Sequence, residues 1–507
     1  MKHFERLISL LLGASLTLAY APFSYWFIAP VALTTQLILL KRTQHSAFTL
    51  GWVFGIGWFG AGISWVHVSI SQFGGIPLIA SVAMMLTLCG YLALYPAIAF
   101  YVTRKYVNPN HWYWSLPAIW FITEWIRGWF LTGFPWLSLG YTQTLSPLNA
   151  WAPLIGETGI SLLLLGISAF LCSVVTTNRI TAGLKKPAFT LFVSVSLIFG
   201  LSTLIKQVHW TQPTKEKTRI TMVQGNIKQA LRWVPEQDLP TMNKYLSLTE
   251  AHWDADVVIW PEAAIPRLEP LAKTYLENLD ALAKEHNTGL ITGIVNYNFE
   301  TRDAYNTLMT LGQADSAPSQ DEGAYFYGHP NRYEKHHLLP IGEFIPLESW
   351  IRGLAPIFDL PMSSFSRGDY VQANLEANGI YFAPAICFEI AFPDQIRANL
   401  NHHTNFIITV SNDAWFGRSH GPHQHLEIAQ MRALEFGLPV IRATNNGITA
   451  FINTNGRVQA QAPQFEDATL TQSIASTTGT TPYRALGNFP LWIFSVIALF
   501  FTFRHRQ

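Results

Sequence analysis

Long uncharged apolar runs fill the N-terminal part of the chain and return near its C-terminal end. No Asp, Glu, Lys or Arg occurs from Leu7 to Leu40 or from Thr43 to Thr103. A helix that crosses a bilayer needs about 20 mostly apolar residues, and runs of this length fit a large buried core poorly. The pattern predicts eight transmembrane helices: two in Leu7–Leu40 divided near Pro22, two in Thr43–Thr103, and one each in 112–130, Thr158–Asn178, Pro187–Ile205 and Ala485–Phe503.

Basic residues gather in alternate short loops of this bundle. The positive-inside rule places such loops in the cytoplasm. It follows that both termini are cytoplasmic and that the long segment before the last helix lies outside the cytoplasm. The sequence Ala19-Tyr20-Ala21 leaves open a cleaved signal peptide, although cleavage there leaves the long segment on the same side. The basic residues are Lys2, Arg6, Lys41, Arg42, Arg104, Lys105, Arg179, Lys185, Lys186, Arg504 and Arg506.

Between the bundle and the last helix, apolar runs of strand length alternate with helical spacing. We expect a transmembrane bundle of seven passes over 1–211, an extracytoplasmic domain over 212–482, and the last helix with a cytoplasmic tail over 483–507. The alternation favours an α/β layered sandwich. The expected strands lie in "RITMVQGNI", "ADVVIWPE", "TGLITGIV", "GIYFAPAICFE", "TNFIITVSND", "LPVIRATN" and "ITAFINTNG", and the expected helices at Glu236–Trp253, Leu271–His286, 391–400 and 423–437.

Composition agrees with a membrane protein and argues against a nucleic-acid partner. Of the 507 residues, 13% are charged, whereas a soluble domain usually carries about 25%. The formal net charge is +1 and there is no long basic run. Cys89 and Cys172 lie in apolar passes and read as small buried hydrophobes. Cys387 is the third cysteine, and a free thiol in an extracytoplasmic domain suggests a chemical role, with an inert buried cysteine as the alternative.

Three stretches each place a reactive side chain at the end of a strand-like run. They are "VVIWPEAAIP" with Glu262, "RYEKHHLLPIGEFIP" with Lys335 and "APAICFEIAFP" with Cys387. A thiol nucleophile, a carboxylate base and an ammonium that stabilises an oxyanion together suffice for acyl transfer. Taken singly, the residues have ordinary readings: a helix cap, a solvated lysine and a core cysteine.

The order and wording of these stretches resemble the nitrilase superfamily, which has a Glu-Lys-Cys triad on an αββα sandwich. With "WPE", "CFE" and "SNDAWFG", and with "APFSYW", "SWVHVSI", "EWIRGW" and "GFPWLSLGYTQ" in the bundle, the whole chain resembles the membrane-embedded branch, the apolipoprotein N-acyltransferases. The resemblance implies Glu262 as general base, Lys335 as oxyanion stabiliser and Cys387 as nucleophile. The polar loop at 312–323 departs from it, being longer than a compact sandwich needs.

The resemblance also implies the substrates and the location. A phospholipid, commonly phosphatidylethanolamine, gives an acyl chain to the thiol as a thioester. The α-amine of an N-terminal S-diacylglyceryl-cysteine on an apolipoprotein then takes it as an amide. The expected location is the bacterial inner membrane with the catalytic domain on the periplasmic side, and no cofactor or metal is expected.

Several further residues are candidates to support the site. The resemblance suggests Glu343 and Glu389, for which ordinary hydrogen-bonded carboxylates are the alternative. Phe388 is expected to line an acyl pocket or to pack in the core. The weaker candidates are Asn306, Trp233 and Trp415. The apolar segment 344–365 is expected either to form a mobile lid at the outer leaflet or to pack on the sandwich.

Two other groups of polar residues have simpler interpretations. His420, His423, His425 and Glu427 stand close enough in sequence to hold a metal, but "GPHQH" reads better as a loop entering a helix. Glu124 and Arg127 share a helix face and are interpreted as a structural ion pair.

Two rival functions stay open from the sequence. One is a membrane-tethered amidase that passes the acyl group to water. The other is a transporter with a vestigial binding domain, although ionisable residues in the passes are few.

Overall fold

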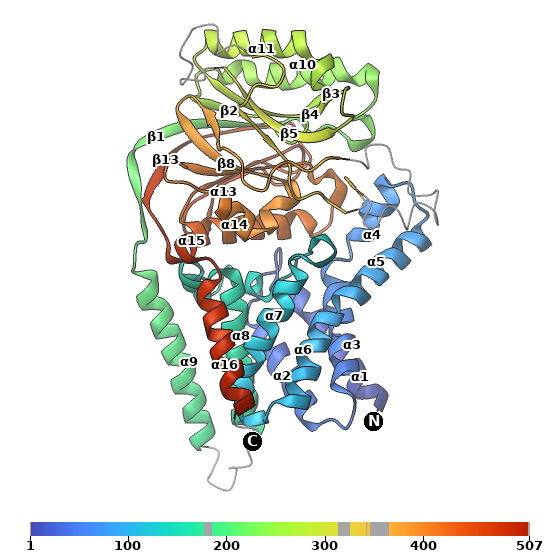
Figure 1. Cartoon of the computed structure of the whole chain (residues 1–507), viewed down its shortest axis with the longest axis vertical. Coiled ribbons are helices and arrows are strands. Elements are labelled where there is room, and N and C mark those ends of the chain that lie inside the picture. The colour runs from blue at the N-terminus through green and yellow to red at the C-terminus, as the bar shows by residue number, and fades with distance from the viewer. Residues whose placement is uncertain (1, 177–184, 313–324, 341, 345–364, 505–507) are drawn as a thin grey trace. The chain divides into compact units, whose positions relative to one another are not determined.

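The computed structural model describes the chain except residues 1, 177–184, 313–324, 341, 345–364 and 505–507 (Figure 1). The expected lid at 344–365 and the polar loop at 312–323 therefore lie almost wholly outside the described residues. The chain divides into two compact units. The first comprises Met1–Trp210, Arg418–Glu427 and Thr480–Gln507, and the second comprises Thr211–Gly417 and Ile428–Gly479.

The first unit is helical. Its helices are α1 (Lys2–Ser15), α2 (Ile28–Arg42), α3 (Ala47–Gly62), α4 (Val66–Val68), α5 (Leu78–Leu92), α6 (Leu94–Tyr106), α7 (Trp112–Arg127), α8 (Ala152–Thr176), α9 (Lys185–Lys206), α15 (Pro482–Leu486) and α16 (Phe489–Arg504). Helices thus occupy every run in which a pass was expected.

The length of these helices supports fewer membrane spans than the hydropathy pattern predicts. Among the described residues, Leu78–Tyr106 and Pro147–Thr176 are long and apolar enough to cross a bilayer. A third span is counted if Ala47–Gly62 and Val66–Gln72, which are bent by 58°, form one broken crossing. Phe489–Arg504 is apolar but shorter. The eight-helix bundle is therefore not confirmed.

Helices α1 and α3 pack with their backbones in contact. A Cβ atom on Gly13 would lie 1.9 Å from the carbonyl oxygen of Phe54, and one on Gly57 would lie 2.1 Å from that of Leu10. Only glycine fits at these two positions, because a larger residue would push the helices apart. Such close packing of small residues is a common way for helices to associate where water does not drive them together.

Residues Arg418–Glu427 come from far along the sequence yet belong to the first unit. The side-chain oxygen of Gln424 accepts hydrogen bonds from the indoles of Trp65 and Trp136, at 3.1 and 2.8 Å. Its nitrogen donates to the carbonyl of Gly62 at 2.9 Å. One side chain thus satisfies two indole donors and a backbone acceptor inside the unit.

The residues weighed as metal ligands lie on this same segment. His420 Nε2 lies 2.9 Å from the carbonyl oxygen of Gly62. The backbone nitrogen of Ala21 lies 3.2 Å from each carboxylate oxygen of Glu427, and burial raises the pKa of Glu427 well above its usual value. Within the described ranges, no group of three or more His, Cys, Asp or Glu side chains is arranged to hold a metal.

The interpretation of Glu124 and Arg127 as a structural pair is confirmed. Their side chains form an ion pair one helical turn apart. Arg127 also donates to the carbonyls of Phe134 and Trp136, at 2.9 and 2.7 Å. The guanidinium is buried, so these partners offset the cost of removing its charge from water.

The second unit contains two β-sheets. The seven-stranded sheet has the order β13-β1-β2-β4-β5-β6, and β3 pairs with β4. The six-stranded sheet has the order β12-β11-β10-β9-β8-β7. The strands are β1 (Thr211–Gln224), β2 (Val257–Ile259), β3 (Ile265–Leu268), β4 (Gly289–Tyr297), β5 (Ala304–Leu311), β6 (Arg332–Glu334), β7 (Leu375–Ala377), β8 (Ile380–Ile386), β9 (Phe406–Ser411), β10 (Val440–Thr444), β11 (Ala450–Ile452), β12 (Val458–Gln461) and β13 (Ala468–Gly479).

Alternation along the strands builds two apolar layers. Inward-facing residues of both sheets, such as Ile259 and Ile408, form one buried cluster. The opposite face of the seven-stranded sheet, with Val258 and Trp260, packs on α10 (Asp238–Thr249) and α11 (Lys273–Glu285). Because successive side chains of a strand point to opposite faces, an unbroken apolar run such as "VVIW" is what a sheet covered on both sides requires.

Helices α13 (Pro393–Asn399) and α14 (Gly421–Phe436) follow β8 and β9 along the chain. In Figure 1, α10 and α11 lie on the outer face of the seven-stranded sheet, and α13 lies beside the other sheet. The α/β sandwich predicted from the sequence is confirmed. Strand β13 was not predicted, because "ATLTQSIASTTG" is mostly polar, and it lies at the edge of its sheet, paired antiparallel with β1.

A buried ion pair ties the seven-stranded sheet together and gives a prediction. Arg332 on β6 donates two hydrogen bonds, of 2.8 and 2.9 Å, to the two carboxylate oxygens of Glu269, which is 0% exposed. We expect Glu269→Gln to lower the free energy of unfolding by about 3–5 kcal/mol, because Arg332 keeps a buried charge without its counterion. The loss is measured as a lower thermal midpoint of the purified protein in detergent.

The matched control is the exposed pair of Arg219 and Asp254, whose side chains are 45% and 64% exposed and 2.9 Å apart. Asp254→Asn should change the free energy of unfolding by no more than about 1 kcal/mol, because water screens an exposed pair. Equal losses from both variants would contradict the assignment of Arg332 and Glu269 as a structural pair.

Candidate functional site

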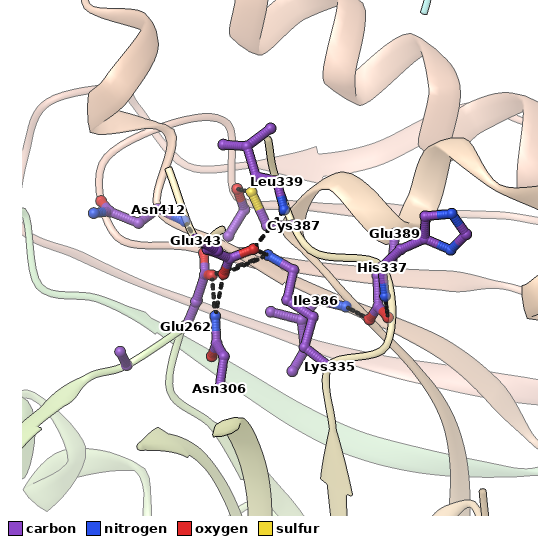
Figure 2. A network of polar contacts seen from close by, with 12 residues as sticks. Glu262, Asn306, Lys335, His337, Leu339, Glu343, Ile386, Cys387, Glu389 and Asn412 are labelled. Carbon is purple, nitrogen blue, oxygen red and sulfur yellow. Dashed lines mark hydrogen bonds and ion pairs between the residues drawn. The ribbon is translucent and has the colours of Figure 1, made fainter. Parts of the chain in front are cut away.

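Glu262 lies just beyond the carboxyl end of β2, after Trp260 and Pro261. Each oxygen of its carboxylate has a donor. The side-chain nitrogen of Asn306, on β5, donates to Oε1 at 2.8 Å, and the backbone nitrogen of Asn412, which follows β9, donates to Oε2 at 2.9 Å. The two sheets therefore hold this carboxylate jointly, as Figure 2 shows.

Lys335 follows β6 directly, and its side chain is 1% exposed. Its ammonium lies 2.8 Å from Glu343 Oε2, 2.9 Å from Glu343 Oε1 and 3.8 Å from Glu262 Oε1. Burial alone would lower the pKa of Lys335, but the charges of Glu343 and Glu262 outweigh burial and raise it above its usual value. Lys335 is therefore a permanent cation between two carboxylates (Figure 2).

Cys387 follows β8 and begins a short 3-10 helix, Cys387–Ala391. Its φ of 54° lies in the left-handed region, which residues other than glycine adopt only when their surroundings enforce it. Burial, and after it the negative charge of Glu262, raise the pKa of the thiol to about 12 against the opposing charge of Lys335. Cys387 is thus a neutral thiol at rest, and the charge of Glu262 acts on it.

Arg232, which was not predicted as a site residue, supports the turn that carries Glu262. Its guanidinium donates to the backbone carbonyl of Glu262 and, at 3.2 Å, to that of Ala263. Ala263 has a φ of 42°, so these bonds help to hold a strained turn. Burial lowers the pKa of Arg232, and the charge of Glu262 opposes that effect. In the sequence, the feature that could have pointed to Arg232 was a basic residue directly before Trp233.

The charges of four side chains in this network balance. Glu262 and Glu343 carry two negative charges, and Lys335 and Arg232 carry two positive ones. A proton that moves from Cys387 to Glu262 leaves this total unchanged. Buried charges are costly without partners, so the arrangement allows the thiol to ionise inside the site without a net charge appearing there.

The supporting candidates fall into two groups. Glu343 and Asn306 belong to the network around Glu262 and Lys335, since Asn306 also donates to Glu343 at 2.9 Å and the backbone nitrogen of Leu339 donates to Glu343 at 2.8 Å. Glu389 instead accepts hydrogen bonds from the backbone nitrogens of Ile386, His336 and His337, at 2.8, 2.8 and 3.0 Å (Figure 2). It joins the segment after Lys335 to the segment around Cys387.

Three aromatic candidates occupy different environments. Phe388 is buried and packs edge-on against Phe392, with ring centroids 5.0 Å apart, which favours its interpretation as core. Trp233 is 41% exposed, and the guanidinium of Arg232 lies 5.9 Å from its ring. Trp415 is partly buried in the 3-10 helix Asp413–Phe416, three residues after the backbone nitrogen that holds Glu262.

The comparisons with known proteins cover both units. Residues 12–170 match the family model of the apolipoprotein N-acyltransferase N-terminal domain, and residues 219–483 match that of the carbon-nitrogen hydrolases. The apolipoprotein N-acyltransferase of Photobacterium profundum is 48% identical over 96% of this chain and 92% of its own length. That of Vibrio parahaemolyticus is 46% identical over 96% and 94%.

Among solved structures, the chain is similar to Nit3 of Saccharomyces cerevisiae, a member of the nitrilase superfamily. The TM-score is 0.38 and the identity 15%, over 52% of this chain and 93% of that one. The two curated relatives, matched over nearly their full length, show that the chain belongs to the apolipoprotein N-acyltransferase family.

Proposed function

We propose that this enzyme transfers an acyl chain from a phospholipid, through a thioester on Cys387, to the α-amine of the N-terminal S-diacylglyceryl-cysteine of apolipoproteins. Its family makes it an acyltransferase acting on lipoproteins. The observation that carries the mechanism is the charge-balanced network in which Lys335 lies between Glu262 and Glu343, with both Glu262 and Lys335 acting on the partly buried thiol of Cys387. Phosphatidylethanolamine is the donor we favour.

In the first step, the sulfur of Cys387 attacks the ester carbonyl of the phospholipid while Glu262 takes the thiol proton. The hydrogen bonds from Asn306 and Asn412 fix the carboxylate for this transfer. Lys335, held by Glu343, stabilises the negative oxygen of the tetrahedral intermediate. The bond to the lysophospholipid oxygen then breaks, and Glu262 returns the proton to that leaving oxygen.

In the second step, the amine of the diacylglyceryl-cysteine attacks the thioester carbonyl. Glu262 takes a proton from the amine as the new C–N bond forms, and the C–S bond breaks. The proton passes to the departing sulfur, which restores the thiol. A thioester is more reactive toward an amine than an oxygen ester is, so two steps replace one difficult one.

The membrane supplies both substrates. The apolar helices Leu78–Tyr106 and Pro147–Thr176 are consistent with the membrane location of the family. We further propose that the first unit forms an eight-pass bundle and that the second unit faces the periplasm. The basic residues of the short loops fall on alternate connections, which places those loops in the cytoplasm.

The proposed thioester on Cys387 can be tested by mass spectrometry. Incubation with phosphatidylethanolamine and no acceptor should add the mass of one acyl chain to the intact protein, and a diacylglyceryl-cysteine peptide should remove it. Cys387→Ala should gain no mass, because the other cysteines, Cys89 and Cys172, are buried in the first unit. Loss of the adduct at the same rate without peptide would favour an amidase-like hydrolase, and no adduct would contradict the mechanism.

The proposed proton transfer from Cys387 to Glu262 predicts how the rate of alkylation of Cys387 by iodoacetamide depends on pH. In the wild type, Glu262 accepts the thiol proton inside the site, so the rate should be nearly constant from pH 7 to 9. In Glu262→Gln the proton must leave for solvent against a pKa still raised by burial. Its rate should be lower at pH 7 and rise about tenfold per pH unit, because only the thiolate reacts.

The rate is measured as alkylation of the Cys387 peptide by mass spectrometry. Asp254→Asn, which removes an exposed carboxylate of the same unit, is the control and should keep the flat profile. A flat profile in Glu262→Gln would show that Glu262 is not the base.

The proposed periplasmic location of the second unit can be tested by chemical labelling. In spheroplasts, a membrane-impermeant maleimide should label Glu300→Cys, at an exposed position of the second unit, but not Lys105→Cys, at an exposed position in a predicted cytoplasmic loop. Both are made in a Cys387→Ala background, and detergent should make both react. Labelling of Lys105→Cys before detergent would overturn the proposed topology.

A further inference from the structure

The hydroxyl of Ser411 lies between the nucleophile and a buried carboxylate. Ser411 ends β9 and is 0% exposed. Its oxygen lies 3.5 Å from Cys387 Sγ and 2.6 Å from Asp413 Oδ1. A serine hydroxyl has a single hydrogen, so it can donate to the sulfur or to the carboxylate, but not fully to both.

Asp413 is a fixed negative charge. Its other oxygen, Oδ2, accepts a hydrogen bond of 2.7 Å from Arg442 on β10, and both side chains are buried. The neighbouring backbone is closely packed, since a Cβ atom on Gly447 would lie 2.2 Å from Asp413 Oδ2. While Cys387 is a neutral thiol, this carboxylate is the stronger acceptor and holds the serine hydrogen.

We propose that Ser411 is a further catalytic residue, whose hydroxyl hydrogen turns from Asp413 to the sulfur of Cys387 when the sulfur becomes negative. This rests on the proposed function, in which Cys387 is the nucleophile. The thiol proton still goes to Glu262, and the serine O–H bond is never broken. Only its hydrogen bond changes partner. Once the thioester forms, the sulfur is neutral and the hydrogen returns to Asp413.

The same hydrogen bond assists the second step. When the amine expels the sulfur from the thioester, negative charge develops on the sulfur again. A donor aimed at that atom stabilises the leaving thiolate as the C–S bond breaks. Ser411 therefore acts on the sulfur in both directions, as nucleophile and as leaving group.

Four charged groups act on the thiol besides this neutral donor. Glu262 and Asp413 are negative and raise the pKa of Cys387, whereas Lys335 is positive and lowers it. The fourth is Arg232, whose pKa is lowered by burial, and the charge of an ionised Cys387 opposes that effect. The hydrogen bond from Ser411 lowers the pKa of the thiol. Removing the hydroxyl and removing the charge of Asp413 should therefore change the ionisation of the thiol in opposite directions.

The test is the alkylation rate of Cys387 by iodoacetamide between pH 7 and 9, in the full-length protein. Ser411→Ala should lower the rate about tenfold at every pH, because a hydrogen bond to a charged atom is lost, and should keep the flat profile that depends on Glu262. Ser411→Thr, which keeps the hydroxyl, should restore most of the rate. Asp413→Asn should raise it.

Thr409→Val is the matched control. Thr409 lies two residues earlier on β9, on the same face, and its buried hydroxyl has no hydrogen-bond partner among the residues that the structure describes. Its rate should equal that of the wild type. The thermal midpoint of each variant shows whether it is folded.

The results separate this inference from the proposed function. A rate for Ser411→Ala within twofold of the wild type would overturn the role of Ser411. Equal decreases in Ser411→Ala and Asp413→Asn would also overturn it, since they would show that both residues only support the fold. A wild-type protein that alkylates as described but takes no acyl chain from phospholipid would overturn the proposed function and leave the hydrogen bond of Ser411 to the sulfur intact.

Discussion

The site depends on a buried cation between two carboxylates. Lys335 is almost completely removed from water, and it stays charged because Glu343 and Glu262 lie on either side of it. Arg232 supplies the second positive charge and holds the turn after Glu262. The network is thus a set of mutually dependent charges, in which a carboxylate and an ammonium act on one sulfur.

The sandwich provides the rigidity that this network needs. Glu262 follows a strand of one sheet, and the backbone nitrogen of Asn412 follows a strand of the other, so the hydrogen bond between them spans the two sheets. Glu389 accepts hydrogen bonds from backbone nitrogens of two segments, and so joins the segment after Lys335 to the end of β8. The sequence analysis gave Glu389 as a residue that supports the site or as an ordinary hydrogen-bonded carboxylate, and its contacts place it in the backbone around Cys387.

Much of the fold could be predicted from the sequence, and Glu262 and Cys387 could be singled out as candidate site residues, because strand-length apolar runs end there in unusual polar residues. The positions that the sequence did not reveal depend on tertiary contacts. Arg232 stands among the apolar residues Leu231, Trp233 and Val234, and only the folded chain brings its guanidinium to the carbonyl of Glu262. Ser411 and Asp413 stand inside a recognised motif, but the bond to the sulfur crosses between strands. The uncharged runs indicate a membrane, yet helix length decides how many of them span it.

The place of Arg418–Glu427 in the first unit has a consequence for protein engineering. The second unit is discontinuous in sequence, since this ten-residue segment interrupts it. A soluble fragment cut at residues 211 and 479 would carry the segment away from its partners. Gln424 would lose the two indoles and the carbonyl that satisfy its amide, and Glu427 would lose the backbone of Ala21. A water-soluble version of the enzyme therefore needs this segment redesigned, and trimming the ends alone does not suffice.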